Sequence, residues 1–351
     1  MKKYIRFRIK KPAVSYLVSK QALKVTMVLL LLSFAVFIGS AALGEMRISP
    51  LNVIKVFFGM GSEMDTLVIQ SFRLPRIIIA LFAGIALAVA GSILQGISRN
   101  PLASPDIIGI VGGASTAVVA FLAIFSDKNN ALTVSIKWMP LAAFLGALII
   151  GIVVYLLAWK DGISPLRLVL IGIGISVLMQ SLTTLFMVVG PIYRANQANV
   201  WLTGTVYGSS WSDVQILVPW TVFLLLICVL MIRQLNIQEL GEDLAKGVGS
   251  ALQKDRMLLL LISTALTGGA VAFAGGLGFV GLMAPHIARR LVGSTFGALM
   301  PVSAMVGGIL VMLADLAGRT LFSPLEVPAG VFTAAFGAPY FIYLLYKSKN
   351  Q

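Results

Sequence analysis

Few side chains in this sequence are of the types that carry out chemistry. Its 351 residues include one histidine, His286, and one cysteine, Cys228, which excludes a histidine-paired metal site, a cysteine-ligated cluster and an intrachain disulfide. A nucleophile–base–acid arrangement is also missing, because no partner in the sequence can be assigned to His286. The sequence therefore predicts no enzyme active site, no metal site and no cofactor, and we expect His286 to be structural.

An internal source of energy is equally hard to find. The phosphate loop G-x-x-x-x-G-K-[ST] is absent, and the G-x-G-x-x-G string at Gly276–Gly281 lies between two apolar segments, which favours close helix packing. Ion-coupled carriers usually keep ionisable groups at membrane depth. Here Asp315 is the clearest ionisable residue inside an apolar segment, and no relay can be assembled around it. A sodium site made of backbone carbonyls would escape this argument. If the chain transports, we expect a separate subunit to supply the energy.

The elements that position these residues are membrane helices. The chain is 58% hydrophobic and 11% charged, with a mean hydropathy of +0.96, whereas a soluble fold has about a quarter of its residues charged. We predict an all-α, polytopic membrane protein, with a basic N-terminal segment over 1–24 and a single transmembrane domain over 25–351. Apolar runs of about 20 residues predict ten spans, at 25–44, 76–97, 107–125, 139–159, 167–189, 214–232, 257–276, 278–292, 297–317 and 328–346.

The distribution of basic residues predicts the orientation of these spans. Ten spans place both termini on one side, and nineteen of the 27 Lys and Arg residues fall in segments on that side, against eight on the other. The positive-inside rule then makes both termini cytoplasmic. The net charge of +14 is accordingly a topology signal, and we expect no nucleic-acid partner.

Two segments of the chain resemble each other. An offset of 185 aligns Ala80–Gly96 with Ala265–Gly281 and makes five of 17 pairs identical, although chance matches are common in a chain rich in Gly and Ala. The second and seventh spans cross in opposite directions, so the repeat would be an inverted one that relates spans 2–5 to spans 7–10. Inverted repeats in transporters place the substrate path at the interface between the halves.

A series of different short motifs extends along the chain from about residue 50 to its end. They are Arg73-Leu74-Pro75-Arg76, Gly91–Gln95, Asn100–Gly109, Gly278–Leu282, Pro285-His286, Ala314-Asp315, Arg319, Pro328–Gly330 and Gly337–Pro339. As an ordered set they resemble the FecCD family of ABC-importer permeases, which includes the ferric-siderophore, haem and cobalamin permeases.

The resemblance implies a multi-subunit importer in the bacterial cytoplasmic membrane. Two permease subunits, identical or related, would form the pore, two cytoplasmic ATPase subunits would hydrolyse ATP, and an extracytoplasmic binding protein would deliver the substrate. A ferric-siderophore complex is the expected substrate because it is the commonest in the family. Cobalamin and haem are alternatives within the class, and an ion-coupled secondary carrier is the alternative from a different class.

Arg73, Arg76 and Arg319 are expected at the outer ends of spans, against the overall charge bias. The resemblance implies that they bind carboxylates of the binding protein, and the planar guanidinium suits bidentate pairing with carboxylate. The alternatives are snorkelling to lipid headgroups and internal pairing, for instance of Arg319 with Asp315 four residues earlier on the same helix.

An inside loop over 240–249 resembles the short coupling helices with which the family contacts its ATPase. Glu242, Ala245 and Gly249 are the residues expected to make this contact, and a solvated connector is the alternative. The outer segment 193–211 resembles a short helix near the pore mouth. Candidate pore-lining residues are Gln180, Thr183, Thr184 and Trp201. A Trp at this place could equally anchor at the membrane interface, and hydroxyls within a span could equally bond to their own helix.

Overall fold

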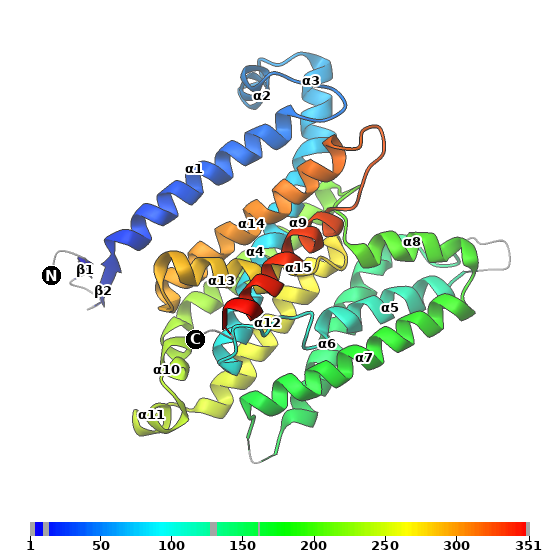
Figure 1. Cartoon of the computed structure of the whole chain (residues 1–351). Coiled ribbons are helices and arrows are strands. Elements are labelled where there is room, and N and C mark those ends of the chain that lie inside the picture. Colours follow the sequence, from blue (N-terminus) through cyan, green and yellow to red (C-terminus); the bar gives the residue numbers. More distant parts are fainter. Residues whose placement is uncertain (1–3, 10–13, 127–131, 161, 349–351) are drawn as a thin grey trace.

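The structure is a computed structural model that describes residues 4–9, 14–126, 132–160 and 162–348, most of them in helices (Figure 1). In chain order the elements are β1 Tyr4–Ile9, β2 Val14–Ser19, α1 Lys20–Ala42, α2 Pro50–Phe57, α3 Glu63–Leu67, the π-helix η1 Val68–Arg73, α4 Leu74–Ser98, α5 Ile110–Ile124, the 3-10 helix η2 Ile136–Trp138, α6 Met139–Ala158, α7 Pro165–Val189, α8 Ile192–Thr203, α9 Trp211–Leu230, α10 Ile232–Glu239, α11 Glu242–Gly247, α12 Leu252–Ala274, α13 Val280–Val292, α14 Phe296–Thr320 and α15 Ala329–Ser348.

The predicted spans coincide with α1, α4, α5, α6, α7, α9, α12, α13, α14 and α15. Among the described residues, seven helices are long and apolar enough to cross a membrane, with α4 counted together with α3 and η1. The apolar part of α15 that was searched, Ala329–Tyr343, is shorter. Helices α5 and α13 have 15 and 13 residues. The chain is therefore a multi-pass membrane protein in which two of the predicted spans are short helices.

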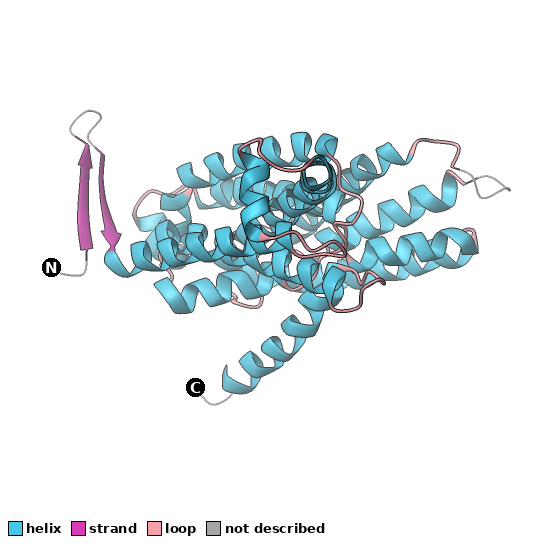
Figure 2. Cartoon of the chain, turned by 90° about the horizontal axis from the view of Figure 1, so that it is seen from above, coloured by secondary structure: helices cyan, strands magenta, loops and turns pink. Residues whose placement is uncertain are grey.

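The N-terminal segment contains an element that the all-helical prediction missed. Strands β1 and β2 form an antiparallel hairpin in which Tyr4 pairs with Ser19 and Ile9 with Val14. The hairpin stands beside the helical body and leads directly into α1, whose first residue is Lys20 (Figure 2). Part of the basic N-terminal segment predicted over 1–24 lies outside the described residues, including Lys2, Lys3, Lys10 and Lys11.

The core forms around α4 and α12, which pack against each other and against neighbours on both sides. Small residues allow this close approach. A Cβ on Gly91 of α4 would collide with the backbone of Gly281 in α13, and one on Gly84 would collide with the backbone of Gly307 in α14. Membrane helices often associate through such small-residue contacts, because without a Cβ the two backbones can touch. The G-x-G-x-x-G string thus contributes to helix packing, as predicted.

The helix pairing has the symmetry that an inverted repeat of spans 2–5 and 7–10 requires. Helix α4 packs on α14 as α12 packs on α6, and each half contains one short helix, α5 or α13. Both short helices follow a residue with left-handed backbone, Gly109 at φ 88° and Phe279 at φ 65°. The register inferred from sequence is not supported, because Gly91 contacts Gly281 whereas its aligned partner Gly276 contacts Leu202.

Candidate functional site

A cavity of about 720 Å³ opens at the end of the bundle where α1 finishes and α4 begins. Its walls come from the loop after α1, from η1, from the segment between α8 and α9, and from the end of α14 with the loop that follows. Charged and aromatic residues in its lining are Glu45, Arg73, Arg76, Tyr207, Trp211, Arg319 and Glu326. The three arginines predicted to act together are therefore neighbours in space, although Arg319 is more than 240 residues from the other two.

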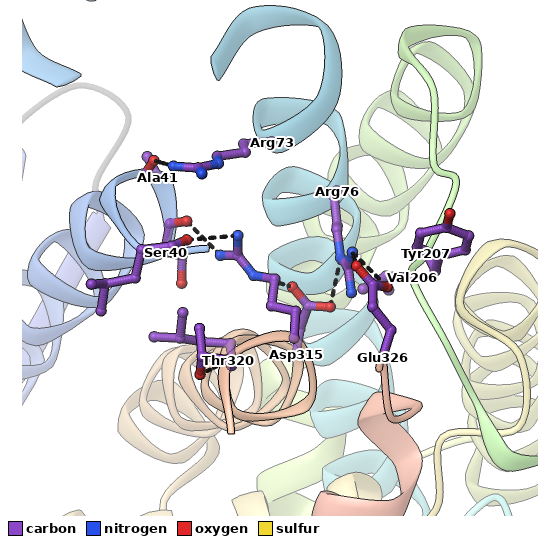
Figure 3. Close-up of polar contacts among 12 residues, drawn as sticks. Ser40, Ala41, Arg73, Arg76, Val206, Tyr207, Asp315, Thr320 and Glu326 are labelled. Atoms are coloured by element: carbon purple, nitrogen blue, oxygen red, sulfur yellow. Dashed lines mark hydrogen bonds and ion pairs between the residues drawn. The ribbon is translucent and has the colours of Figure 1, made fainter. Parts of the chain in front are cut away.

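Arg76 lies in the first turn of α4 and points towards two carboxylates (Figure 3). Its Nε lies 2.8 Å from Oδ1 of Asp315, and its Nη1 lies 3.0 Å from Oε1 of Glu326. On another side its guanidinium carbon lies 5.5 Å from the ring centroid of Tyr207, a cation–π distance. Its side chain is 12% exposed, so Arg76 is partly accessible from the cavity.

Arg73 and Arg319 are more deeply buried and serve a different purpose. Both donate to carbonyls in the last turn of α1, where C=O groups lack intrahelical partners, and to carbonyls in the loop that follows. Arg73 Nη1 donates to Ala41 O at 2.6 Å, and its Nη2 donates to Met46 O. Arg319 Nη1 donates to Leu43 O at 2.9 Å, and its Nη2 donates to Ser40 O. The two arginines thus cap α1 and attach it to the end of η1 and to α14.

Asp315 in α14 pairs with both Arg76 and Arg319. Its second oxygen, Oδ2, lies 3.6 Å from Arg319 Nε, which is the i,i+4 pair named as an alternative from the sequence. The carboxylate is buried, and the two guanidiniums compensate its charge. In this structure Arg319 therefore forms an internal ion pair with Asp315. Glu326 and Tyr207 were not among the residues predicted from the sequence. Glu326 could have been noticed as an acid in the loop just after Arg319.

Helix α11 lies at the opposite end of the bundle from α2 and α3 (Figure 1). It is the short helix expected in the loop 240–249. Glu242 and Asp243 stand in its first turn and Lys246 in its last, which suits the helix dipole. Ala245 is buried, and Gly249 has φ 75°, a left-handed backbone that ends the helix.

The predicted pore-lining residues separate into two groups. Gln180 and Thr184 are exposed on one face of α7 in this single chain, and the Thr184 hydroxyl donates to Gln180 O at 3.0 Å within its own helix. Thr183 is buried, and its hydroxyl lies 3.0 Å from that of Thr116 on α5. Trp201 is buried as well, and its carbonyl accepts from Gly276 N at 3.0 Å. Thr183 and Trp201 thus secure helix contacts in this conformation.

A half-buried carboxylate between the helices, Asp106, was also missed. Asp106 precedes α5, and its Oδ2 accepts from Phe279 N, the residue before α13, at 3.1 Å. The backbone carbonyl of Asp106 itself accepts from Ser176 Oγ, halfway along α7, so Asp106 lies between the spans. The search for ionisable residues inside apolar segments, which found Asp315, therefore missed a second carboxylate. Asp106 stood in a connection rather than an apolar run, which is why a scan of the spans did not find it.

Among the residues that the structure describes, no group of three or more His, Cys, Asp or Glu side chains could hold a metal ion. His286 Nδ1 lies 2.7 Å from the Tyr340 hydroxyl and thereby links α13 to α15. This contact gives the single histidine a structural partner.

Comparisons with known proteins agree with this arrangement. The chain matches the FecCD transport family over residues 29–347. It is 62% identical to "Probable siderophore transport system permease protein YfhA" of Bacillus subtilis, over 95% of this chain and 97% of the relative. It is 46% identical to the achromobactin transport system permease protein CbrC of Dickeya dadantii, over 92% of this chain and 90% of the relative. It is 43% identical to the iron(3+)-hydroxamate import system permease protein FhuG of Bacillus subtilis, over 94% of this chain and 98% of the relative.

A solved structure has the same fold. A metal-chelate type ABC transporter in an inward-facing conformation superimposes with a TM-score of 0.81 at 30% identity, covering 92% of this chain and 99% of that one. The match in sequence family and the match in fold both extend over nearly the whole chain. This chain belongs to the FecCD transport family.

Proposed function

We propose that this chain is the permease subunit of an ABC importer that moves a ferric-siderophore complex across the bacterial cytoplasmic membrane. The observation that carries the proposal is the family match over residues 29–347, together with relatives named for siderophore, achromobactin and iron-hydroxamate transport. The geometry suits this role. A cavity with a charged rim lies at one end of the bundle, and a short helix in a polar loop lies at the other.

The cavity is proposed to receive the extracytoplasmic binding protein. Of the three arginines, Arg76 is the one suited to direct contact, because it is partly exposed and its Glu326 partner is at the rim. A carboxylate of the binding protein would replace Glu326 on Arg76. Arg73 and Arg319 would contribute positive charge and hold α1 in place. Substituting either of them would disturb α1, so Arg76 variants test docking more cleanly.

Helix α11 is proposed to contact a cytoplasmic ATPase subunit through Glu242, Ala245 and Gly249, with ATP hydrolysis on that separate subunit. Two such ATPase subunits and a second permease subunit, identical or related, would complete the importer. Leu244 and Val248 support this assignment, because they are 61% and 67% exposed and would form an apolar contact surface beside the charges. The basic residues Lys246, Arg289 and Arg290 lie near this end, which favours a cytoplasmic location for it and for both termini.

The path for the substrate is proposed to run along the exposed face of α7. Gln180, Ser181 and Thr184 place uncharged polar groups on a face that a single chain leaves open. Polar side chains are disfavoured against lipid, so the second permease subunit is expected to enclose this face.

The test is uptake in a strain that lacks its own copy of the gene. Cells carrying the wild-type chain should accumulate iron-55 from a ferric siderophore, and Arg76→Glu should abolish this accumulation. Lys55→Glu, the same charge change at an exposed position of α2, is the matched control and should leave uptake unchanged. Equal amounts of chain in the membrane must be confirmed. Competition by cobalamin or haem, but by no ferric siderophore, would contradict the proposed substrate class.

A further inference from the structure

We infer that Arg256 is a positioning residue that joins α11, α12 and the turn between α6 and α7 into one mechanical unit. Its function would be to convert a displacement of α11 into a displacement of the membrane core. The inference rests on the proposed function, since α11 must contact an ATPase for such a displacement to arise.

The contacts of one guanidinium carry this inference. Arg256 lies in the first turns of α12 and its side chain is 0% exposed. Its Nη2 lies 2.8 Å from Oε1 of Glu242, the first residue of α11. Its Nη1 donates to the carbonyl of Ile163, in the turn before α7, at 2.6 Å. Two consecutive helices and a turn 93 residues away in the sequence therefore meet at a single buried charge.

A buried charge resists separation from its partners. Leaving a guanidinium without its carboxylate in a low-dielectric site is strongly unfavourable. If Glu242 moved away with α11 while Arg256 stayed, the charge would keep one neutral carbonyl as its contact. Moving α11 and the start of α12 together avoids this loss. The ion pair thus favours concerted movement of the two helices.

The turn between α6 and α7 is attached to α12 by a second bond. Gln253, one turn before Arg256, accepts from Ile163 N through Oε1 at 2.8 Å. Both backbone groups of Ile163 are therefore bonded to α12. Helix α7 begins at Pro165, directly after this turn, and it carries Gln180 and Thr184. A shift of Arg256 would be passed to the helix that is proposed to line the path.

The opposite end of α12 reaches the far side of the core. The helix packs along α4 and α6, ends at Ala274 and is followed by Gly275. The next residue, Gly276, donates to the carbonyl of Trp201 at the end of α8. The chain leaves α8 through Val206–Trp211 into the cavity wall. Arg256 therefore sits at the start of a continuous packed connection from α11 to the cavity.

The experiment uses the complex of this chain with its ATPase subunits in lipid nanodiscs. Ser71, exposed on the cavity wall, is replaced by cysteine as a reporter, and the native Cys228 is buried. The rate of maleimide labelling is measured without nucleotide and with ATP plus vanadate. Glu242→Gln, Arg256→Gln and the double variant are compared at equal ATPase content. Asp243→Asn, the adjacent and exposed acid of α11, is the matched control.

Wild type and Asp243→Asn should show the same nucleotide-induced change in labelling rate. Glu242→Gln and Arg256→Gln should each reduce it at least about fivefold, the lower end of typical coupling between sites. The double variant should lose no more than either single one, because both remove the same link. Full retention in Glu242→Gln, or losses that multiply in the double variant, would overturn the inference. If Arg256→Gln does not fold, Glu242→Gln against Asp243→Asn decides. ATPase subunits that fail to bind even the wild-type chain would overturn the proposed function as well.

Discussion

The charge balance at the cavity makes a prediction with a definite sign. If Arg76 receives a carboxylate of the binding protein, Glu326 is a competitor for the same guanidinium, and Glu326→Gln should tighten docking. The opposite sign is expected for Arg76→Gln, which removes the receiving group. A purely structural role for the pair would instead make both substitutions neutral or both harmful to docking.

The structure sets the size of the effect. Arg76 Nη1 lies 3.0 and 3.1 Å from the two oxygens of Glu326, but the Glu326 side chain is 38% exposed and is therefore screened by water. Exposed ion pairs are worth about 0.2–1 kcal/mol. The burial of Arg76 and the two contacts place this pair in the upper part of that range, at about 0.5–1 kcal/mol. Removing the competitor should thus lower the dissociation constant of the binding protein about two- to fivefold.

The assay is biolayer interferometry of the binding protein on nanodiscs that contain the permease. Measurements at low and high salt add a check, because the difference between Glu326→Gln and wild type should shrink as salt screens the competing pair. Weaker docking of Glu326→Gln would refute the reasoning, since it would show that Glu326 itself attracts the binding protein. Unchanged docking of Arg76→Gln would refute it as well.

Three further predictions concern the chain itself. Asp315→Asn removes the buried charge between Arg76 and Arg319 and should lower the free energy of unfolding by about 3 kcal/mol. This is the lower end for a broken buried pair, because both arginines keep other partners. A smaller loss of thermal stability in Asp315→Asn than in Glu326→Gln would contradict the prediction. Gly249→Pro cannot adopt φ 75° and should uncouple ATP hydrolysis from uptake. Gly247→Ala is the control, because Gly247 has open space around it, and it should leave coupling intact. Normal uptake per ATP in Gly249→Pro would exclude the role of this turn. Burial raises the pKa of the Glu239 carboxyl, so the folded chain binds this proton more tightly than the unfolded chain does. The stability of the folded chain should therefore rise as pH falls through that pKa. Glu239→Gln should reduce this rise in thermal unfolding, and identical pH profiles for the variant and the wild type would contradict the prediction.

Features that depend on local pattern were predictable from the sequence. Apolar runs located the ten helices, because a spanning segment must be apolar along its whole length. The Asp315–Arg319 pair was foreseeable because residues four apart share a helix face. The short helix α11 was expected because the segment 240–249 resembles the coupling helices of the FecCD family.

Features that depend on long-range contacts were not predictable in the same way. The start of α13 is fixed by Phe279, whose left-handed backbone is held by Asp106 from a distant connection. The capping of α1 by Arg319 joins residues more than 270 positions apart. The pairing of Arg256 with Glu242 requires that α11 fold back onto α12. In each case the side-chain type was visible in the sequence, but its partner was set by the packing of the helices.

The proposed function makes this chain a gate that depends on separate ATPase subunits for its energy. The most direct measurement is accumulation of a ferric siderophore labelled with iron-55 in proteoliposomes, with the binding protein outside. The account predicts accumulation when the ATPase subunits and internal ATP are both present, and none when either is omitted. Accumulation by the chain alone, driven by a proton or sodium gradient, would contradict it.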